Sequence, residues 1–96
     1  MAKFELTRAA DRDLADIYIY SHAQFGERQA DDYLIGLESC FARLAEMTDL
    51  GRSIEHIRAG YYRFSHARHV IFYNKIAEGV RIVRVLHVAM DPERHL

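Results

Sequence analysis

Arginine and histidine side chains are concentrated in the second half of this 96-residue chain. Residues 50–96 hold eight Lys and Arg against four Asp and Glu, a balance of +4, and five of the six histidines. In a catalytic site, Arg would hold a phosphate and His would move protons, which is the chemistry of RNA cleavage. The residues available for such a site are Arg63, Arg68, Arg81, Arg84, His66 and His87. The same residue types also build protein interfaces, so both interpretations stay open at this point.

The near-neutral net charge of −1 hides a segregation of charge along the chain. Residues 1–49 carry five Lys and Arg against ten Asp and Glu, a balance of −5. Eleven of the thirteen cationic residues are Arg, whose guanidinium makes bidentate contacts with carboxylates and phosphates. This pattern predicts either charges that pair across the fold or a basic surface that binds an acidic partner.

The other reactive side chains give weaker signals. His66 and His69 would point to opposite faces of one strand, so we expect no metal site. Cys40 falls on the apolar stripe of a helix and is expected to be a buried, structural thiol. Because Cys40 is the single cysteine, no internal disulfide can form, and this indicates a protein of the reducing cytoplasm. We expect no membrane span, because no apolar run approaches about 20 residues, and no signal peptide, because the N-terminus lacks an apolar centre. We also expect no cofactor.

Hydrophobic periodicity predicts a single α+β domain over residues 1–96 with the element order β-α-α-β-β-β. Apolar residues at helical spacing predict one helix that ends at Gly26 and a second over residues 27–47. Their link is too short for anything but an antiparallel hairpin. Strands are expected at residues 3–7, 61–65, 68–76 and 80–88. The expected architecture is an antiparallel sheet with the helical hairpin, from the N-terminal half of the chain, packed on one face.

The last predicted strand is apolar on both faces, which requires a cover on both sides of the sheet. We expect Tyr62, Phe64, Val70 and Phe72 to face the helices. The opposite face would then carry Ile71, Tyr73, Val83 and Val85, with no element left to cover it.

An apolar centre with a basic rim is typical of a partner-binding surface. The first helix offers a second such surface, because Ile19 and Tyr20 make it more apolar than one packing face requires. The predicted partner-binding residues are Arg63, Arg68, Ile71, Tyr73, Arg81, Val83, Val85, His87, Ile19 and Tyr20.

Four stretches of the chain, in order and spacing, resemble the RelE/ParE toxin superfamily and its ParE branch in particular. These stretches are residues 13–20 (DLADIYIY), 60–64 (GYYRF), 69–73 (HVIFY) and 82–91 (IVRVLHVAMD). The resemblance implies a bacterial type II toxin–antitoxin system, in which a ParD-like antitoxin with an acidic, flexible segment holds the toxin inactive. It also implies that the toxin acts on DNA gyrase without being an enzyme, and without sequence-specific DNA binding of its own.

The RelE branch of the superfamily instead cuts messenger RNA on the ribosome with basic residues of the sheet. This chain departs from that pattern, because Val70 and the pair Met90 and Asp91 stand where those nucleases place basic residues. Arg63 is an exception, since it keeps a position that is basic in the nucleases. Because of the departures at Val70, Met90 and Asp91, we favour a gyrase inhibitor. The alternatives are a RelE-like mRNA interferase that uses Arg63, Arg81, Arg84 and His66 or His87, and a non-toxic interaction module.

Overall fold

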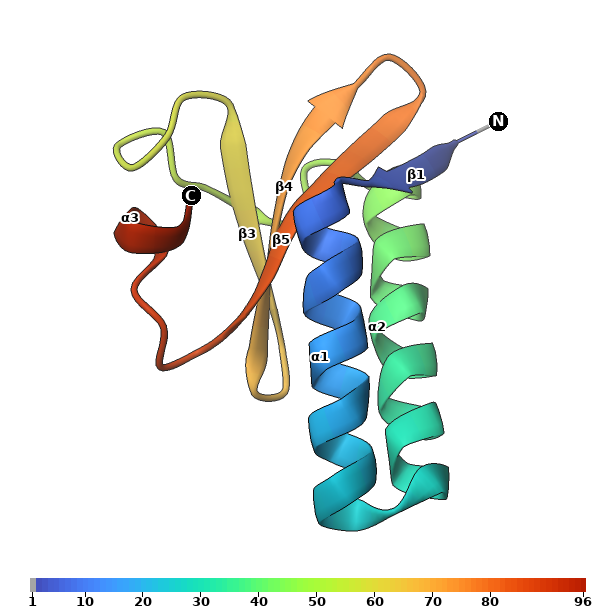
Figure 1. Ribbon diagram of the computed structural model, residues 1–96. Helices are drawn as coiled ribbons and strands as arrows, with labels where there is room; N and C mark the ends of the chain where they lie inside the picture. The colour runs from blue at the N-terminus through green and yellow to red at the C-terminus, as the bar shows by residue number, and fades with distance from the viewer. Residues whose placement is uncertain (1) are drawn as a thin grey trace.

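A helical hairpin packs beside a five-stranded sheet in the computed structural model, which describes residues 2–96 (Figure 1). The elements are β1 (Lys3–Leu6), α1 (Arg8–Phe25), α2 (Glu27–Glu46), β2 (Arg52–Ser53), β3 (Tyr61–His66), β4 (His69–Ile76), β5 (Gly79–His87) and α3 (Pro92–His95). The α+β class and the N-terminal helical hairpin predicted from periodicity are both confirmed.

The ends of the hairpin helices follow from single residues. Thr7 caps α1, because its hydroxyl accepts a hydrogen bond from the Ala10 N–H at 3.0 Å. Gly26 separates the helices with a φ of 90°, a backbone conformation that favours glycine. The apolar stripe of α2 is fully buried at Leu37, Phe41 and Leu44. These three side chains form the centre of the core between the hairpin and the sheet.

The sheet is mixed rather than antiparallel throughout, with the strand order β1-β5-β4-β3-β2. All neighbouring pairs are antiparallel except β1 and β5, which run parallel. The helical hairpin and three further strands separate β1 from β5 in the chain, a connection long enough for a parallel pair. The parallel register pairs Phe4 with Val80 and Leu6 with Ile82, which places all four apolar side chains under the helices. Alternation within β1 carried no information about its direction.

The two faces of the sheet are partly exchanged relative to the prediction. Tyr62 and Phe64 do pack against the helix-side core. Directly opposed residues share a face, and the register sets Tyr62 opposite Tyr73 and Phe64 opposite Ile71. Tyr73 and Ile71 therefore lie under the helices, as does Val85. The prediction was wrong because the tight turn after His66 pairs even-numbered residues of β3 with odd-numbered residues of β4.

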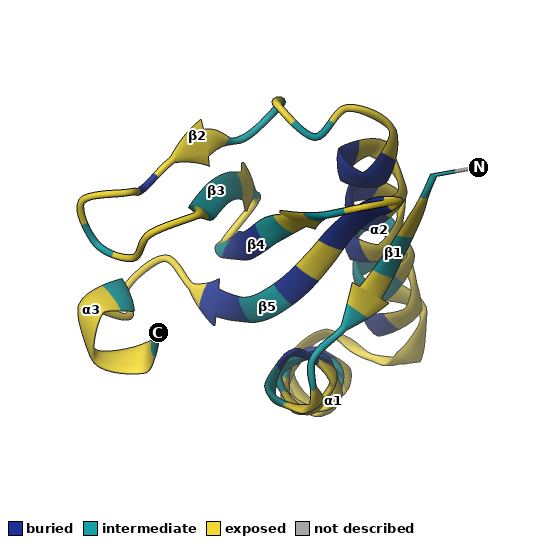
Figure 2. Cartoon of the chain, turned by 90° about the horizontal axis from the view of Figure 1, so that it is seen from above, coloured by how far each residue is buried: buried dark blue, intermediate teal, exposed yellow. Residues whose placement is uncertain are grey.

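The other face of the sheet is covered by the chain itself, so the predicted uncovered face does not exist. Val70 and Phe72 lie on this face with Leu86, and each is 4% exposed or less. Ile54 and Leu96 pack on them from the segment after β2 and from the end of α3. Figure 1 shows this segment and α3 on the side of the sheet away from the hairpin. Figure 2 shows the resulting bands of buried residues along β4 and β5.

Candidate functional site

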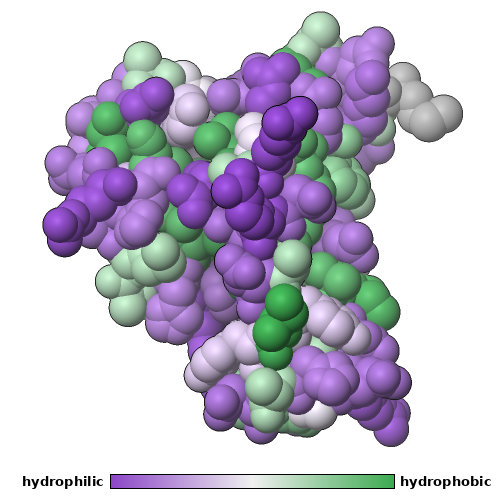
Figure 3. Space-filling model, in the orientation of Figure 1, coloured by the Kyte–Doolittle hydropathy of each residue, from purple (hydrophilic) through white to green (hydrophobic). Residues whose placement is uncertain are grey.

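A groove of about 1160 Å³ lies between the helical hairpin and one end of the sheet. One wall consists of α1 and α2, and the other consists of the β3–β4 turn and the last residues of β5. The outline of the molecule is indented where the hairpin projects beyond the sheet (Figure 3). Large apolar side chains line this groove while remaining exposed, with 59% of Tyr20, 49% of Phe25 and 38% of Met90 accessible. Such a cluster is typical of an interaction site.

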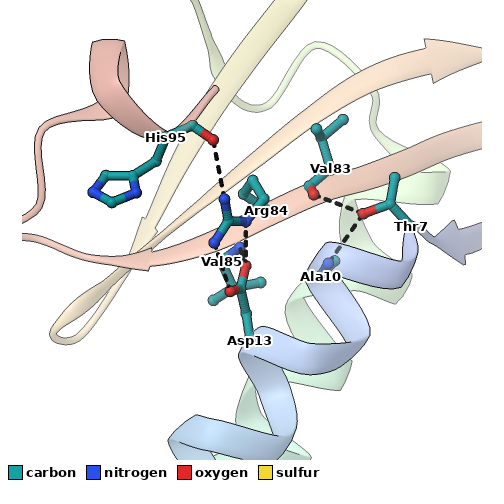
Figure 4. A network of polar contacts seen from close by, with 7 residues as sticks. All are labelled: Thr7, Ala10, Asp13, Val83, Arg84, Val85 and His95. Carbon is teal, nitrogen blue, oxygen red and sulfur yellow. Dashed lines mark hydrogen bonds and ion pairs between the residues drawn. The ribbon is translucent and has the colours of Figure 1, made fainter.

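An ion pair fixes the distance between the two walls at the inner end of the groove. The Arg84 guanidinium donates to both carboxylate oxygens of Asp13, at 2.7 and 2.8 Å, and the Val85 N–H donates to the same carboxylate at 2.9 Å (Figure 4). Arg84 also donates to the His95 carbonyl at 3.0 Å. The hydrogen bonds that Arg84 donates to Asp13 raise the pKa of the guanidinium. The Arg84 side chain therefore links α1, β5 and α3 through hydrogen bonds.

A second contact between α1 and β5 lies beside this ion pair. The Thr7 hydroxyl that caps α1 also donates to the Val83 carbonyl at 2.7 Å (Figure 4). Val83 has no opposed residue on β4, because the register shifts there between Phe72 and Tyr73. This irregularity turns the Val83 carbonyl to a side chain instead of a strand neighbour.

Histidine and tyrosine side chains form the floor of the groove. The Tyr33 hydroxyl lies 2.6 Å from Nδ1 of His69, whose ring meets that of His87 edge-on at 5.5 Å between centroids. Burial, with the neighbouring His87 and His66, lowers the pKa of His69 to about 4. His69 is therefore neutral near pH 7, and it serves as a hydrogen-bonding group rather than as a charge.

His66 and His69 lie on the same face of the sheet, contrary to the prediction, because they are opposed across the turn. Nδ1 of His66 is 3.3 Å from Sγ of Cys40. Burial raises the pKa of the Cys40 thiol, which keeps it protonated and agrees with a structural role. Within residues 2–96, no group of three or more His, Cys, Asp or Glu is arranged to hold a metal ion.

The predicted partner-binding residues divide among three places. Arg68, His87 and Tyr20 are exposed and line the groove. Ile19 is 66% exposed beside Tyr20 on α1 but outside the groove lining.

The core holds a second group of the predicted residues. Ile71 and Tyr73 are fully buried and Val85 is 3% exposed, so the expectation of an exposed apolar sheet patch was wrong for them. Val83 is half-buried beside Thr7.

The third group lies on the sheet face away from the helices. Arg81 is paired there with Glu5 at 2.8 Å, and Arg63 lies opposite Phe72. The sequence prediction missed Phe25 and Met90, which line the groove. Phe25 shares the helical spacing of Leu14 and Ile17, so its position in the sequence does not distinguish it from a core residue.

The six residues considered for RNA cleavage divide between two places: His66, Arg68, Arg84 and His87 line the groove, whereas Arg63 and Arg81 do not. Arg63 and Arg81 lie on the covered face, whereas His66 lies under the helices against Cys40. Arg84 makes three hydrogen bonds, two to the Asp13 carboxylate and one to the His95 carbonyl. A single phosphate cannot contact Arg63 or Arg81 together with the histidines of the groove, because the sheet separates them.

The geometry defines a small α+β protein with an open groove between a helical hairpin and the edge of a mixed sheet. A family model described as the ParE toxin of the type II toxin–antitoxin system parDE matches residues 4–92. This chain belongs to that family, which confirms the resemblance drawn from the sequence.

Individual proteins agree with this family assignment. Toxin ParE1 of Caulobacter vibrioides is 40% identical over 96 residues, covering 100% of this chain and 99% of that protein. Toxin ParE1 of Mycobacterium tuberculosis is 35% identical, covering 99% of this chain and 98% of that protein. A solved structure of the chromosomal ParDE TA system from P. aeruginosa shares the fold, with a TM-score of 0.78 at 18% identity, covering 92% of this chain and 97% of that one. No helix within residues 2–96 has the length and apolarity to cross a membrane.

Proposed function

We propose that this ParE-family toxin inhibits DNA gyrase in the bacterial cytoplasm and is neutralised when a ParD-like antitoxin binds in the groove. Family membership supports the toxin and antitoxin parts of the proposal. The groove supports the docking part, because it is the place where Tyr20, Phe25 and Met90 leave apolar surface open to water. An antitoxin segment that covers these side chains would gain the hydrophobic free energy of their burial.

The charges of the groove favour an acidic segment on its sheet side. Arg68 lies at the β3–β4 turn with its guanidinium 5.6 Å from the centre of the Phe25 ring, and it has no ion-pair partner within residues 2–96. His87 is exposed beside it along the groove. A carboxylate of the antitoxin next to Arg68 would form a charge-assisted contact next to the aromatic ring.

The proposal assigns no enzymatic activity to the chain and no sequence-specific DNA contact. The support is the separation of Arg63 and Arg81 from His66 by the sheet, together with the commitment of Arg84 to Asp13. Expression of the chain alone should therefore produce no new messenger-RNA ends on ribosomes. New ends that vanish in an Arg63→Ala variant would favour the RelE-like alternative.

A gyrase supercoiling assay with purified protein and a growth assay in cells test the proposal. The chain without antitoxin should inhibit gyrase supercoiling, and induced expression should arrest growth. Addition of the ParD-like protein from the neighbouring gene should restore supercoiling, and its co-expression should restore growth. A chain that leaves supercoiling unchanged but binds that protein would be a non-toxic interaction module. A chain that does neither would contradict the proposal.

A further inference from the structure

Two arginines of the sheet lack the carboxylate partner that the other basic strand residues have. The Lys and Arg residues on strands are Lys3, Arg52, Arg63, Lys75, Arg81 and Arg84. Four of them form ion pairs: Lys3 with Glu78, Lys75 with Asp49, Arg81 with Glu5 and Arg84 with Asp13. Arg52 and Arg63 have no ion pair within residues 2–96, and their guanidinium groups donate no hydrogen bond there.

These two arginines are direct neighbours across β2 and β3. The register sets Arg52 opposite Arg63, and opposed residues share a face of the sheet. Arg63 also lies opposite Phe72, so both arginines belong to the face away from the helices. Like charges directly opposite each other destabilise a sheet, and no contact of the described chain offsets this cost. An uncompensated pair of this kind indicates a partner outside the chain.

The surroundings of the arginine pair suit a protein contact. β2 is exposed at both of its residues and lies at the opposite edge of the sheet from β1 (Figure 2). Arg63 is half-buried, so its guanidinium is partly withdrawn from water without a protein partner. Tyr61 lies on the same face two residues earlier, and the Arg58 guanidinium is 5.7 Å from the centre of its ring. Arg and Tyr are enriched among the residues that dominate binding at protein interfaces.

The charge of the chain selects the kind of anion that fits this surface. Neighbouring guanidinium groups bind carboxylates as well as phosphates. Nucleic-acid-binding domains are usually strongly basic, because phosphates recur along the whole strand. This chain has a net charge of −1, and residues 1–49 carry a balance of −5. A long polyanion would be repelled beyond the arginine pair, whereas an acidic segment of a protein presents its carboxylates locally.

We propose that Arg52 and Arg63 anchor an acidic segment of the protein that the toxin attacks. Each guanidinium would donate two hydrogen bonds to a carboxylate of that segment. The carboxylates would also remove the repulsion between the two arginines, so the target supplies the compensation that the chain lacks. Neither arginine lines the groove, so this surface is separate from the proposed antitoxin site. The inference rests on the proposed function for the identity of the target as DNA gyrase.

The dissociation constant of the chain and gyrase, measured without DNA, tests the inference. Arg52→Glu/Arg63→Glu should bind gyrase about tenfold or more weakly than the unmodified chain. Arg12→Glu/Arg28→Glu is the matched control, because it reverses the same number of charges at exposed positions of the hairpin helices. The control should bind gyrase nearly as the unmodified chain does, and both variants should keep their affinity for the antitoxin.

The outcomes separate this inference from the proposed function. Equal affinities of the two variants for gyrase would overturn the arginine anchor while the proposed function stands. Failure of the unmodified chain either to bind gyrase or to inhibit it would overturn both.

A neutral substitution separates binding from stability. Arg52→Gln removes one of the opposed charges, so the midpoint of urea unfolding should stay the same or rise. Its affinity for gyrase should nevertheless fall by about threefold or more. A lower midpoint would assign the pair to stability and contradict the inference. Binding of a DNA duplex by the unmodified chain that Arg52→Gln abolishes would show that the pair recognises phosphates, and it would overturn the choice of an acidic protein segment.

Discussion

Removal of the Asp13 carboxylate should destabilise the fold and loosen the groove together. The side chains of Asp13 and Arg84 are 13% and 22% exposed, so the ion pair is largely shielded from water. In Asp13→Ala the guanidinium loses two hydrogen bonds and the Val85 N–H loses its partner. Leaving one member of a buried pair uncompensated costs about 3 kcal/mol of unfolding free energy.

Urea unfolding of four proteins isolates the pair from the remainder of the site. Arg84→Met alone leaves the Asp13 carboxylate with the Val85 N–H as its one partner, and it should cost about 2 kcal/mol. The double variant Asp13→Ala/Arg84→Met leaves no buried charge, so it should recover about 2 kcal/mol relative to the sum of the single costs. A coupling energy near zero, or a cost below about 0.5 kcal/mol for Asp13→Ala, would refute the role of this pair.

Three further predictions concern the groove and the second face of the sheet. Arg68→Glu should weaken antitoxin binding by about tenfold or more, whereas the same change at Arg63 on the opposite face should leave the dissociation constant nearly unchanged in calorimetry. The pKa of His69 lies at about 4 in the fold against 6.5 ordinarily, so the unfolded chain takes up the proton first. The free energy of unfolding should therefore have its full value above pH 6.5 and fall by about 1–2 kcal/mol toward pH 4, since His69 is partly exposed to solvent. His69→Gln should flatten this dependence on pH, and an unaltered dependence would contradict the lowered pKa of His69. Ile54→Ala should cost about 2–4 kcal/mol because Ile54 is 2% exposed, and Met47→Ala, at 55% exposure, should cost far less; equal costs would mean that the segment after β2 does not cover the sheet.

The helical hairpin was predictable because its signals are local. The apolar stripe through Leu37, Phe41 and Leu44 has the period of a helix, and Thr7 and Gly26 mark the helix boundaries. These signals depend on residues a few positions apart, so periodicity reports them directly.

The facing of the strands was not predictable in the same way. A single-residue change in turn length moves every side chain of a strand to the opposite face. The turn between His66 and His69 sets Ile71 and Tyr73 under the helices, and no pattern within β4 distinguishes this from the reverse. The cover of the second face was missed for a related reason. Ile54 and Leu96 are isolated apolar residues in polar surroundings, and they become a cover only when the chain folds back.

The candidate site was predictable only in part. Arg68, His87 and Tyr20 were selected for their residue types, and all three line the groove. Their binding role stays a prediction. The groove itself arises because the hairpin and the sheet diverge beyond the Asp13–Arg84 ion pair, a relation between distant segments that local sequence does not encode.

Titration of the antitoxin into a gyrase supercoiling assay is the most direct test of the central claim, that a gyrase toxin is silenced through its groove. The chain alone should inhibit supercoiling, and the antitoxin should restore it with the unmodified chain. With Arg68→Glu, recovery should need about tenfold more antitoxin. A chain that never inhibits gyrase, or a titration that Arg68→Glu does not shift, would contradict the account.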